Sequence, residues 1–214
     1  QHIEEAGIHS GDSSCVYPAY NLSINAQKKL EKYTKQLALS LNTIGLINIQ
    51  YAIKKNKIYV IEVNPRASRT IPFISKIKDN PYAKFAAQIA AGKKLKSLKF
   101  NNEVTNLIAV KKPVFPFNKF PQQNIFLSPE MKSTGEAIGF DNKLGSAFAK
   151  AEFSAGSHLP IKGTVFISVN DNDKMKSIPI ARDFEDIGFN VIATSGTSEL
   201  LNHNGVFSKN IFVA

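Results

Sequence analysis

The sequence contains no tryptophan, two methionines and a single cysteine among its 214 residues. One cysteine, Cys15, cannot form an internal disulfide, which fits a reducing compartment and leads us to expect a cytoplasmic protein. We interpret Cys15 as a small packed residue and not as a nucleophile. A disulfide-stabilised scaffold is therefore excluded.

Long hydrophobic runs and targeting signals are also missing. No run of about 18 apolar residues occurs, so we expect no segment that spans a membrane. The first residues, Gln-His-Ile-Glu-Glu, have neither the basic region nor the apolar core of a signal peptide. There is no initiator methionine either, which leads us to expect a piece of a longer chain.

Acidic residues are fewer than basic ones, 17 against 27, which gives a net charge of +10 and a pI near 9.6. A basic balance can indicate nucleic acid, an anionic membrane surface or phosphorylated substrates as partners. Here the lysines are spread along the chain in pairs: Lys28-Lys29, Lys54-Lys55, Lys93-Lys94 and Lys111-Lys112. We therefore expect solvated lysine-rich faces and no nucleic-acid partner.

What the sequence does contain is enough apolar material, 43% of its residues, for one or two domains with a core. Ser23 and the spacing of apolar residues predict a helix over 23–42, and residues 46–63 predict an antiparallel hairpin. From residue 163 onward, β-α-β-α-β alternation predicts a parallel sheet. The fold class is therefore α/β, with an antiparallel part followed by a parallel one.

The remaining segments give less regular patterns. We expect a loop over 1–20, a helix over 81–92, a strand within 104–117 broken by Pro113 and Pro116, a turn-rich segment over 128–139 and a helix over 142–153.

Three polar residues stand out in the hairpin. Glu62 and Asn64 lie two apart at the end of its second strand, so they share one face. If the turn centres near residue 55 or 56, Gln50 in the first strand pairs opposite residue 61 or 62. The three side chains then converge on one patch.

This patch offers only oxygen ligands, which suit Mg²⁺, whereas the lack of a Cys/His cluster disfavours zinc. Arg66 and Arg69 follow directly and can grip phosphate or carboxylate oxygens with two hydrogen bonds each. A metal and arginines beside phosphates are the components of phosphoryl transfer. From the residues alone, a second interpretation stays open, in which Glu62 simply pairs with one of the arginines at a sheet edge.

Two further segments carry weaker signals. His9 in "GIHSGD" either lines a nucleotide pocket or caps a turn, and the pattern favours the cap. "TSGT", residues 194–197, follows a strand and opens a helix, which suits a bound anion or an ordinary helix cap equally well.

The motifs "GIHSGDS", "NIQYAI", "IEVNPRASRT", "PFNKFP" and "PEMKSTGEAIG" occur in the order and spacing of one family. In these motifs the chain resembles the large subunit of carbamoyl phosphate synthetase, strongly over 1–157 and more loosely over 163–214. The resemblance implies that residues 1–157 are the C-terminal part of an ATP-grasp domain. It also implies that residues 158–214 are the N-terminal part of a methylglyoxal-synthase-like allosteric domain, cut short at the chain end.

The resemblance further implies an activity. The family makes carbamoyl phosphate from bicarbonate, glutamine-derived ammonia and two ATP, for arginine and pyrimidine biosynthesis, and this unit would phosphorylate carbamate. The implied partners are a small glutaminase subunit and the rest of the large chain. Because the small domain and lid that cover the triphosphate are missing, we expect the chain alone to be inactive. The alternatives are an effector-binding regulatory fragment and another ATP-grasp ligase, such as a biotin carboxylase relative.

Site residues follow from the resemblance position by position. Gln50, Glu62 and Asn64 would bind the Mg²⁺ or Mn²⁺ ions that bridge the ATP phosphates, and Arg66 and Arg69 would stabilise the transferring phosphoryl group and the carbamate. The remaining implied contacts are Gly7, Ile8, His9 and Ser10, with Gln50 and Glu62, for the nucleotide; His2, Glu5 and Ser13 for K⁺; and Lys174, Thr194 and Thr197 for the phosphate of a nucleotide effector, ornithine being the other effector class.

Two positions depart from the family pattern. Glu5 stands where the family has glutamine in the K⁺ site, and Val213 stands near the position of a second effector-binding lysine.

Overall fold

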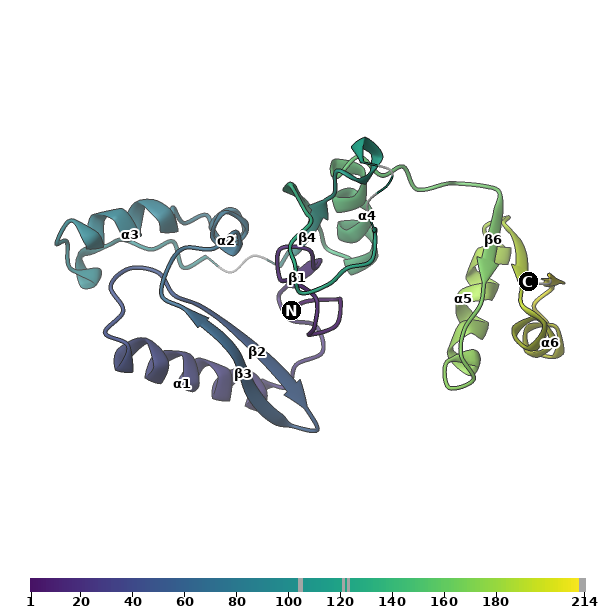
Figure 1. Cartoon of the computed structure of the whole chain (residues 1–214), viewed down its shortest axis with the longest axis horizontal. Coiled ribbons are helices and arrows are strands. Elements are labelled where there is room, and N and C mark those ends of the chain that lie inside the picture. The colour runs from purple at the N-terminus through teal and green to yellow at the C-terminus, as the bar shows by residue number, and fades with distance from the viewer. Residues whose placement is uncertain (104–105, 121, 123, 212–214) are drawn as a thin grey trace. The chain divides into compact units, whose positions relative to one another are not determined.

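The computed structural model describes residues 1–103, 106–120, 122 and 124–211. The chain divides into two compact units, residues 1–158 and residues 159–214 (Figure 1). This division lies one residue after the boundary expected from the sequence. Each unit has its own sheets and is described by itself.

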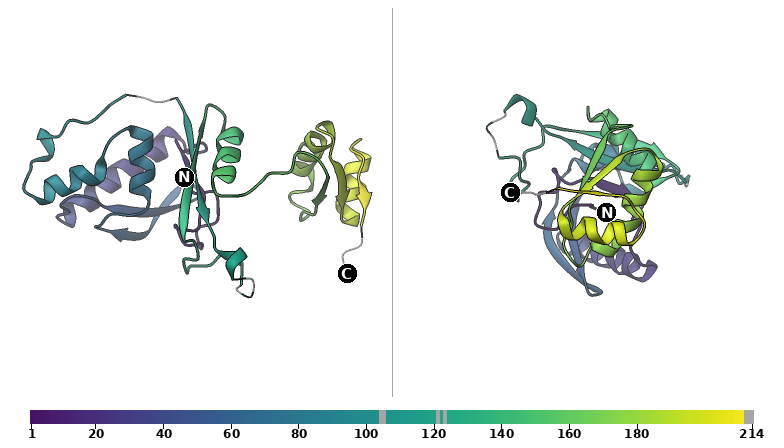
Figure 2. Two further views of the ribbon diagram at one scale, coloured as in Figure 1. Left: turned by 90° about the horizontal axis from the view of Figure 1, so that it is seen from above. Right: turned by 90° about the vertical axis from the view of Figure 1, so that its right-hand side faces the viewer.

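The first unit contains a three-stranded antiparallel sheet in the order β1-β4-β5. Its strands are β1 (Cys15–Tyr17), β4 (Ile108–Val114) and β5 (Gly135–Asp141). Helix α4 (Leu144–Ser154) packs on one face around Val110 (Figure 2), and helix α2 (Thr70–Lys78) packs on the other around Ala109. Because neighbouring residues of a strand point to opposite faces, both helices bury apolar side chains against one sheet.

Helix α4 approaches strand β5 unusually closely at Gly139. A Cβ atom at this position would overlap the backbone of Ala147 and Ala151. Both alanines are fully buried, so small side chains on the helix and a glycine on the strand together allow the contact.

The second sheet of this unit is the hairpin of β2 (Asn48–Lys54) and β3 (Lys57–Asn64), which confirms the prediction. Its two-residue turn has positive φ angles of 49° at Lys55 and 62° at Asn56. Helix α1 (Ile24–Ser40) begins as predicted after Ser23, whose side chain accepts a hydrogen bond from the Ala26 N–H at 3.2 Å. The Thr34 and Tyr51 hydroxyls, 2.9 Å apart, join α1 to β2.

Several expected boundaries were wrong. Residues 128–139 are not turn-rich throughout, because β5 begins at Gly135, and β4 runs through Pro113 to Val114. The loop expected over 1–20 contains β1. Helix α2 was not anticipated, since Pro72 lies inside it; a proline is tolerated in a first turn, where backbone N–H groups lack intrahelical acceptors.

The other elements of this unit are close to their expected places. Helix α3 (Tyr82–Ala90) lies within the range predicted for it, and two short 3₁₀ helices, η1 (Leu95–Ser97) and η2 (Phe117–Lys119), occupy connecting segments.

The second unit confirms the predicted parallel sheet, with order β6-β7-β8. Its elements are β6 (Thr164–Ile167), α5 (Lys174–Asp186), β7 (Asn190–Ala193), α6 (Ser195–His203) and β8 (Lys209–Asn210). The core is formed by Val191, Leu201 and Val206 with their apolar neighbours. Residues 212–214, at the end of the segment in which the last strand of this alternation was expected, lie outside the described part. With antiparallel sheets before a parallel one, the α/β class is confirmed.

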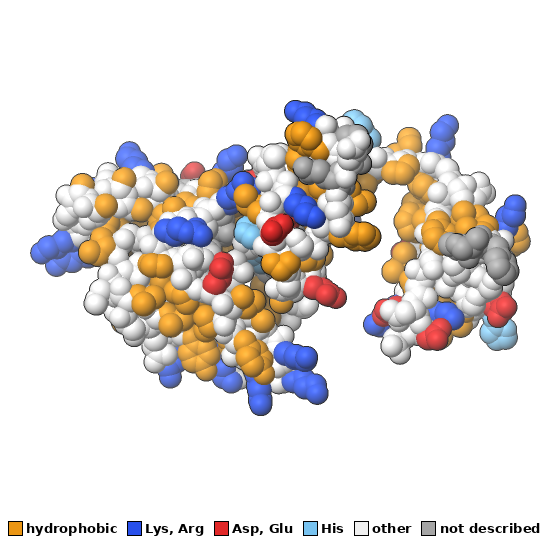
Figure 3. All heavy atoms as spheres, viewed as in Figure 1, with side chains coloured by type: hydrophobic (Ala, Val, Ile, Leu, Met, Phe, Trp, Pro, Cys, Tyr) orange, Lys and Arg blue, Asp and Glu red, His pale blue; other side chains and the backbone are white. Residues whose placement is uncertain are grey.

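Basic side chains lie singly or in small groups on the face of the molecule drawn in Figure 3. Lys111 departs from the expectation of solvated lysines, because only 4% of its surface is exposed. Among the described residues, no helix has both the length and the apolar character needed to cross a membrane.

Candidate functional site

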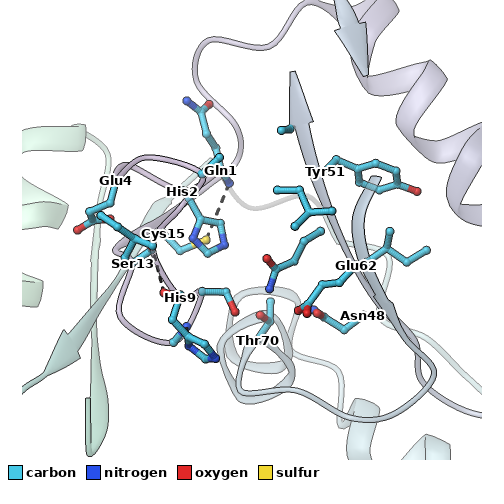
Figure 4. A pocket seen from close by; sticks show the side chains of 18 of the residues that line it. Gln1, His2, Glu4, His9, Ser13, Cys15, Asn48, Tyr51, Glu62 and Thr70 are labelled. Atoms are coloured by element: carbon cyan, nitrogen blue, oxygen red, sulfur yellow. Dashed lines mark hydrogen bonds between the residues drawn. The ribbon is translucent and has the colours of Figure 1, made fainter. Parts of the chain in front are cut away.

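A cleft of about 870 Å³ lies in the first unit between the β2–β3 hairpin and the N-terminal loop. Figure 4 shows Asn48 and Glu62 on the hairpin side of this cleft and His2, His9 and Ser13 on the loop side. The cleft thus joins segments that the sequence analysis had assigned separately to metal, nucleotide and monovalent-cation binding.

The hairpin register brings two of the three predicted metal ligands together, Gln50 and Glu62. Gln50 lies directly opposite Glu62, and Asn48 lies opposite Asn64. Near the turn the register is different, with Lys54 opposite Lys57, and it shifts by one residue between Gln50 and Tyr51. Without this bulge Gln50 would face Ile61, so the irregularity is what aligns the amide with the carboxylate.

The Glu62 carboxylate forms no ion pair with any described residue. Arg66 Nη1 instead donates to the carbonyl of Ala67 at 2.9 Å, and Arg69 Nη1 donates to Ser133 Oγ at 3.2 Å. Glu62 and both arginines line the cleft. The alternative in which Glu62 pairs with an arginine at the sheet edge is therefore wrong for this structure.

The donor set fits a hard divalent cation. Glu62 offers a carboxylate and Gln50 an amide oxygen to the cleft, while Asn64 continues the same strand without lining it. No group of three or more His, Cys, Asp or Glu side chains with metal-binding geometry occurs within the described ranges. A cation held here would need further oxygens, such as those of a phosphorylated ligand, to complete its coordination.

The loop side of the cleft is a compact turn. His9 Nδ1 accepts a hydrogen bond from the Gly11 N–H at 3.0 Å, and the His9 N–H donates to the Ser128 carbonyl at 2.9 Å. The interpretation of His9 as a turn cap is thus confirmed, although the residue also lines the cleft together with Ile8 and Ser10. Gly7, which was grouped with them, is not among the lining residues.

The three residues assigned to K⁺ all line the same cleft: His2, Glu5 and Ser13. Burial of the imidazole, followed by the positive charge of Lys111, lowers the pKa of His2 to about 4, although part of the residue remains accessible to solvent. The ring is consequently neutral at neutral pH and keeps a free lone pair on one nitrogen.

Asn48 and Lys111 are among the lining residues that were missed from the sequence. Asn48 donates to Ser68 Oγ at 3.2 Å, and its spacing of two from Gln50 was a usable signal for a shared strand face. The buried Lys111 donates to the Ser10 carbonyl at 3.2 Å and lies 3.7 Å from a Glu136 carboxylate oxygen.

In the second unit the residues assigned to an effector lie around one turn. Thr194 precedes α6, Thr197 is buried in its first turn, and their hydroxyl oxygens are 3.4 Å apart. A Cβ atom at Gly196 would lie 2.8 Å from Lys174 Nζ, so the ammonium group touches this turn. Lys174 also pairs with Asp171 at 2.7 Å. The position near Val213 lies outside the described residues.

The architecture is similar to a solved biotin carboxylase domain of a thermophilic 2-oxoglutarate carboxylase, bound to ADP, with a TM-score of 0.50 over 97% of this chain and 53% of that chain. At 14% identity this likeness concerns the fold, which is of the ATP-grasp class. Residues 3–98 match the family model for the carbamoyl-phosphate synthase L chain, ATP binding domain.

Nearly the whole chain also aligns with curated relatives. It is 50% identical to the carbamoyl phosphate synthase large chain of Acidobacterium capsulatum, covering 99% of this chain and 20% of that one. It is 52% identical to the large chain of Archaeoglobus fulgidus, covering 96% and 19%. The C-terminal section of the large chain of Aquifex aeolicus is 45% identical, with coverage of 99% and 42%. The chain therefore belongs to the carbamoyl phosphate synthase large-chain family, and it spans about a fifth of the length of most of these relatives.

Proposed function

We propose that the cleft of the first unit binds ATP with Mg²⁺ or Mn²⁺ and transfers the γ-phosphoryl group to carbamate, as part of a glutamine-hydrolysing carbamoyl phosphate synthetase. A carbamate oxygen forms the new P–O bond, the bond between the β- and γ-phosphates breaks, and ADP leaves. The observation that carries this proposal is the alignment of Gln50 with Glu62 in a cleft that Arg66 and Arg69 also line.

Each group in the cleft has a distinct task in this proposal. Glu62 and Gln50 would hold the divalent cation from the wall of the cleft, and Asn64, next on the same strand face, is the third proposed ligand. When bound, the cation would neutralise phosphate charge. Arg66 and Arg69 contact the transferring phosphoryl group and the carbamate, where fixed guanidinium donors stabilise developing negative charge. The remaining assignments are Gly7, Ile8, His9 and Ser10 for the nucleotide, and His2, Glu5 and Ser13 for K⁺.

The second unit has a regulatory role in the same proposal. Lys174, Thr194 and Thr197 bind the phosphate of a nucleotide effector in a methylglyoxal-synthase-like domain, with ornithine as the other effector class. The proximity of Lys174 Nζ to Gly196 favours this assignment. The partners of the chain are the small glutaminase subunit and the rest of the large chain in the cytoplasm, for arginine or pyrimidine synthesis.

The proposal is tested with the full-length protein that contains this chain, by following ATP formation from carbamoyl phosphate and ADP, the reverse of the proposed step. Glu62→Gln keeps the shape of the side chain but removes the charge, and we expect a loss of about 100-fold or more. The matched control is Glu31→Gln on α1, where the carboxylate pairs only with Lys35 on the exposed helix surface. Equal rates for the two variants would contradict the proposal.

A further inference from the structure

We propose that Asp12 and Ser133 act as positioning residues that hold the Arg69 guanidinium ready in the cleft before substrate arrives. The inference rests on the proposed function for what Arg69 then does, but the hydrogen-bonded chain that carries it is a property of the free protein. It links three segments of the chain: the N-terminal loop, the residues after β3, and the loop before β5.

Asp12, in the N-terminal loop, holds the loop that precedes β5. Its side chain is fully buried, and its two oxygens accept hydrogen bonds from the backbone N–H groups of Lys132 at 2.7 Å and Ser133 at 2.8 Å. A buried carboxylate that accepts two N–H donors fixes both in place, because losing either bond would leave a buried polar group unsatisfied.

Ser133, positioned in this way, is the hydrogen-bond acceptor for Arg69. The residue is 4% exposed, and its hydroxyl donates to the Gly11 carbonyl at 3.0 Å. Since the single hydroxyl proton is used there, the oxygen presents only lone pairs to its other neighbour, the Arg69 Nη1 donor at 3.2 Å. Arg69 thus donates to the Ser133 hydroxyl, while Ser133 is itself held by its backbone N–H, which donates to Asp12, and by its hydroxyl, which donates to Gly11.

Arg66 provides the contrast within the same cleft. Its guanidinium donates to the carbonyl of the next residue, Ala67, and no distant segment among the described residues forms a hydrogen bond with it. The loop that carries Ser133 is further secured by Lys132 Nζ, which donates to the Asn124 carbonyl at 3.0 Å and to the Phe126 carbonyl. We infer that Arg69 is oriented in advance, whereas Arg66 adapts to the ligand.

The charge of Asp12 is consistent with this role. Burial acts to raise the pKa of its carboxyl group, but the hydrogen bonds from Ser133 and Lys132 outweigh it, and the pKa falls below the ordinary value. The carboxylate therefore stays ionised at neutral pH and keeps both acceptors.

The first test is nuclear magnetic resonance of the ¹⁵N-arginine-labelled chain, read at the Arg69 side-chain N–H groups. Ser133→Ala should shift the Arg69 signals toward those of a solvated arginine, while Ser133→Thr, which keeps the hydroxyl, should preserve them. Ser14→Ala is the matched control, because its buried hydroxyl has no hydrogen-bond partner among the described residues. Asp12→Asn, in which an NH₂ group replaces one acceptor, should shift Arg69 as well.

The second test measures kinetics in the full-length protein. Because the arginine is placed on the transferring group, Ser133→Ala should lower kcat by about tenfold, with the KM for Mg²⁺–ATP changed less than about twofold. Ser133→Thr should restore most of the rate.

The outcomes separate the two proposals. Arg69 signals that are identical in wild type, Ser133→Ala and Asp12→Asn would overturn the positioning role, even if Glu62→Gln still removed activity. Activity that survives Glu62→Gln would overturn the proposed function, while an Arg69 shift in Ser133→Ala would still support the ordered arginine. A Ser133→Ala variant with shifted signals and unchanged kcat would also overturn the role assigned to Asp12 and Ser133 in the reaction.

Discussion

The two units present their charged groups to ligands in opposite ways. In the first, Glu62 and Arg66 line one cleft without pairing with each other, so their charges remain available to a ligand. In the second, Lys174 is already paired with Asp171, and Thr194 shares hydrogen bonds with neighbouring hydroxyls. Under the proposed function, the first site keeps open charges for a metal and a phosphoryl group, whereas an effector phosphate at the second would have to displace Asp171, whose exposed ion pair contributes little.

The two sites also differ in how the backbone builds them. The cleft depends on a bulged hairpin and on contacts between loops more than 100 residues apart, such as those of Asp12 with Ser133. The turn at 194–197 is local, since it follows one strand and starts the next helix. Perturbations should consequently spread farther in the first unit than in the second.

The largest expected effect is on the second unit, from Leu201→Ala. Leu201 is fully buried in the only large cluster of apolar side chains described there, and its truncation should lower stability by about 3 kcal/mol. Hydrogen exchange of amides in 190–203 measures this loss. The control is Leu200→Ala, at a partly buried neighbour, and an equal loss in both variants would contradict the described core.

The first unit is tested at the contact between α4 and β5. Gly139→Ala places a methyl group into the backbone of the helix and should lower stability by about 2 kcal/mol. Gly145→Ala, on the same helix with no atom near its Cβ position, should leave stability unchanged or raise it slightly. The midpoints of denaturant unfolding, followed at residues 108–114 of β4, compare the stabilities of the two variants. Similar midpoints for Gly139→Ala and Gly145→Ala would contradict the close approach of α4 to β5.

The long-range link in the first unit gives a pH-dependent prediction. The folded-state pKa of Asp12 lies below the ordinary value of 3.8, so its stabilisation is fully present above 3.8 and is lost as pH falls from there through the lower folded-state pKa. Asp12→Asn should therefore cost about 1.5 kcal/mol near neutral pH, and progressively less below pH 3.8. Denaturant unfolding across this range provides the measurement; a difference that does not depend on pH would contradict the assignment.

The smallest expected effect concerns the hairpin turn, which has no counterpart in the described part of the second unit. Lys55 adopts a φ of 49°, which asparagine tolerates better than lysine. Lys55→Asn should stabilise the hairpin by about 0.5 kcal/mol. Lys54→Asn, in the adjacent strand, is the control and should bring no gain in the thermal midpoint.

Local signals explain what could be predicted from the sequence. The hairpin was predictable because the polar turn and the two apolar runs adjoin, and the register between Gln50 and Glu62 followed to within one residue. The parallel sheet was also predictable from local signals, because turn residues separate each of its strands from the helix that follows.

The rest depended on contacts that no local pattern contains. Strand β5 was overlooked because Gly139 suggests a turn, whereas the glycine is needed to admit helix α4. The burial of Lys111 and the link from Asp12 to Ser133 join residues about 100 or more positions apart, so they emerge only when the sheet and loops are assembled.

The most direct test of the proposed metal site uses Mn²⁺ with ATP and the amide signals of the whole chain. Paramagnetic broadening should appear first at 48–50 and 62–64, at the open end of the hairpin, and should disappear in Glu62→Ala. Signals around Lys174 should stay sharp at the same Mn²⁺ concentration. Broadening that persists in Glu62→Ala, or that centres on 171–174 instead, would contradict a metal site at Gln50 and Glu62.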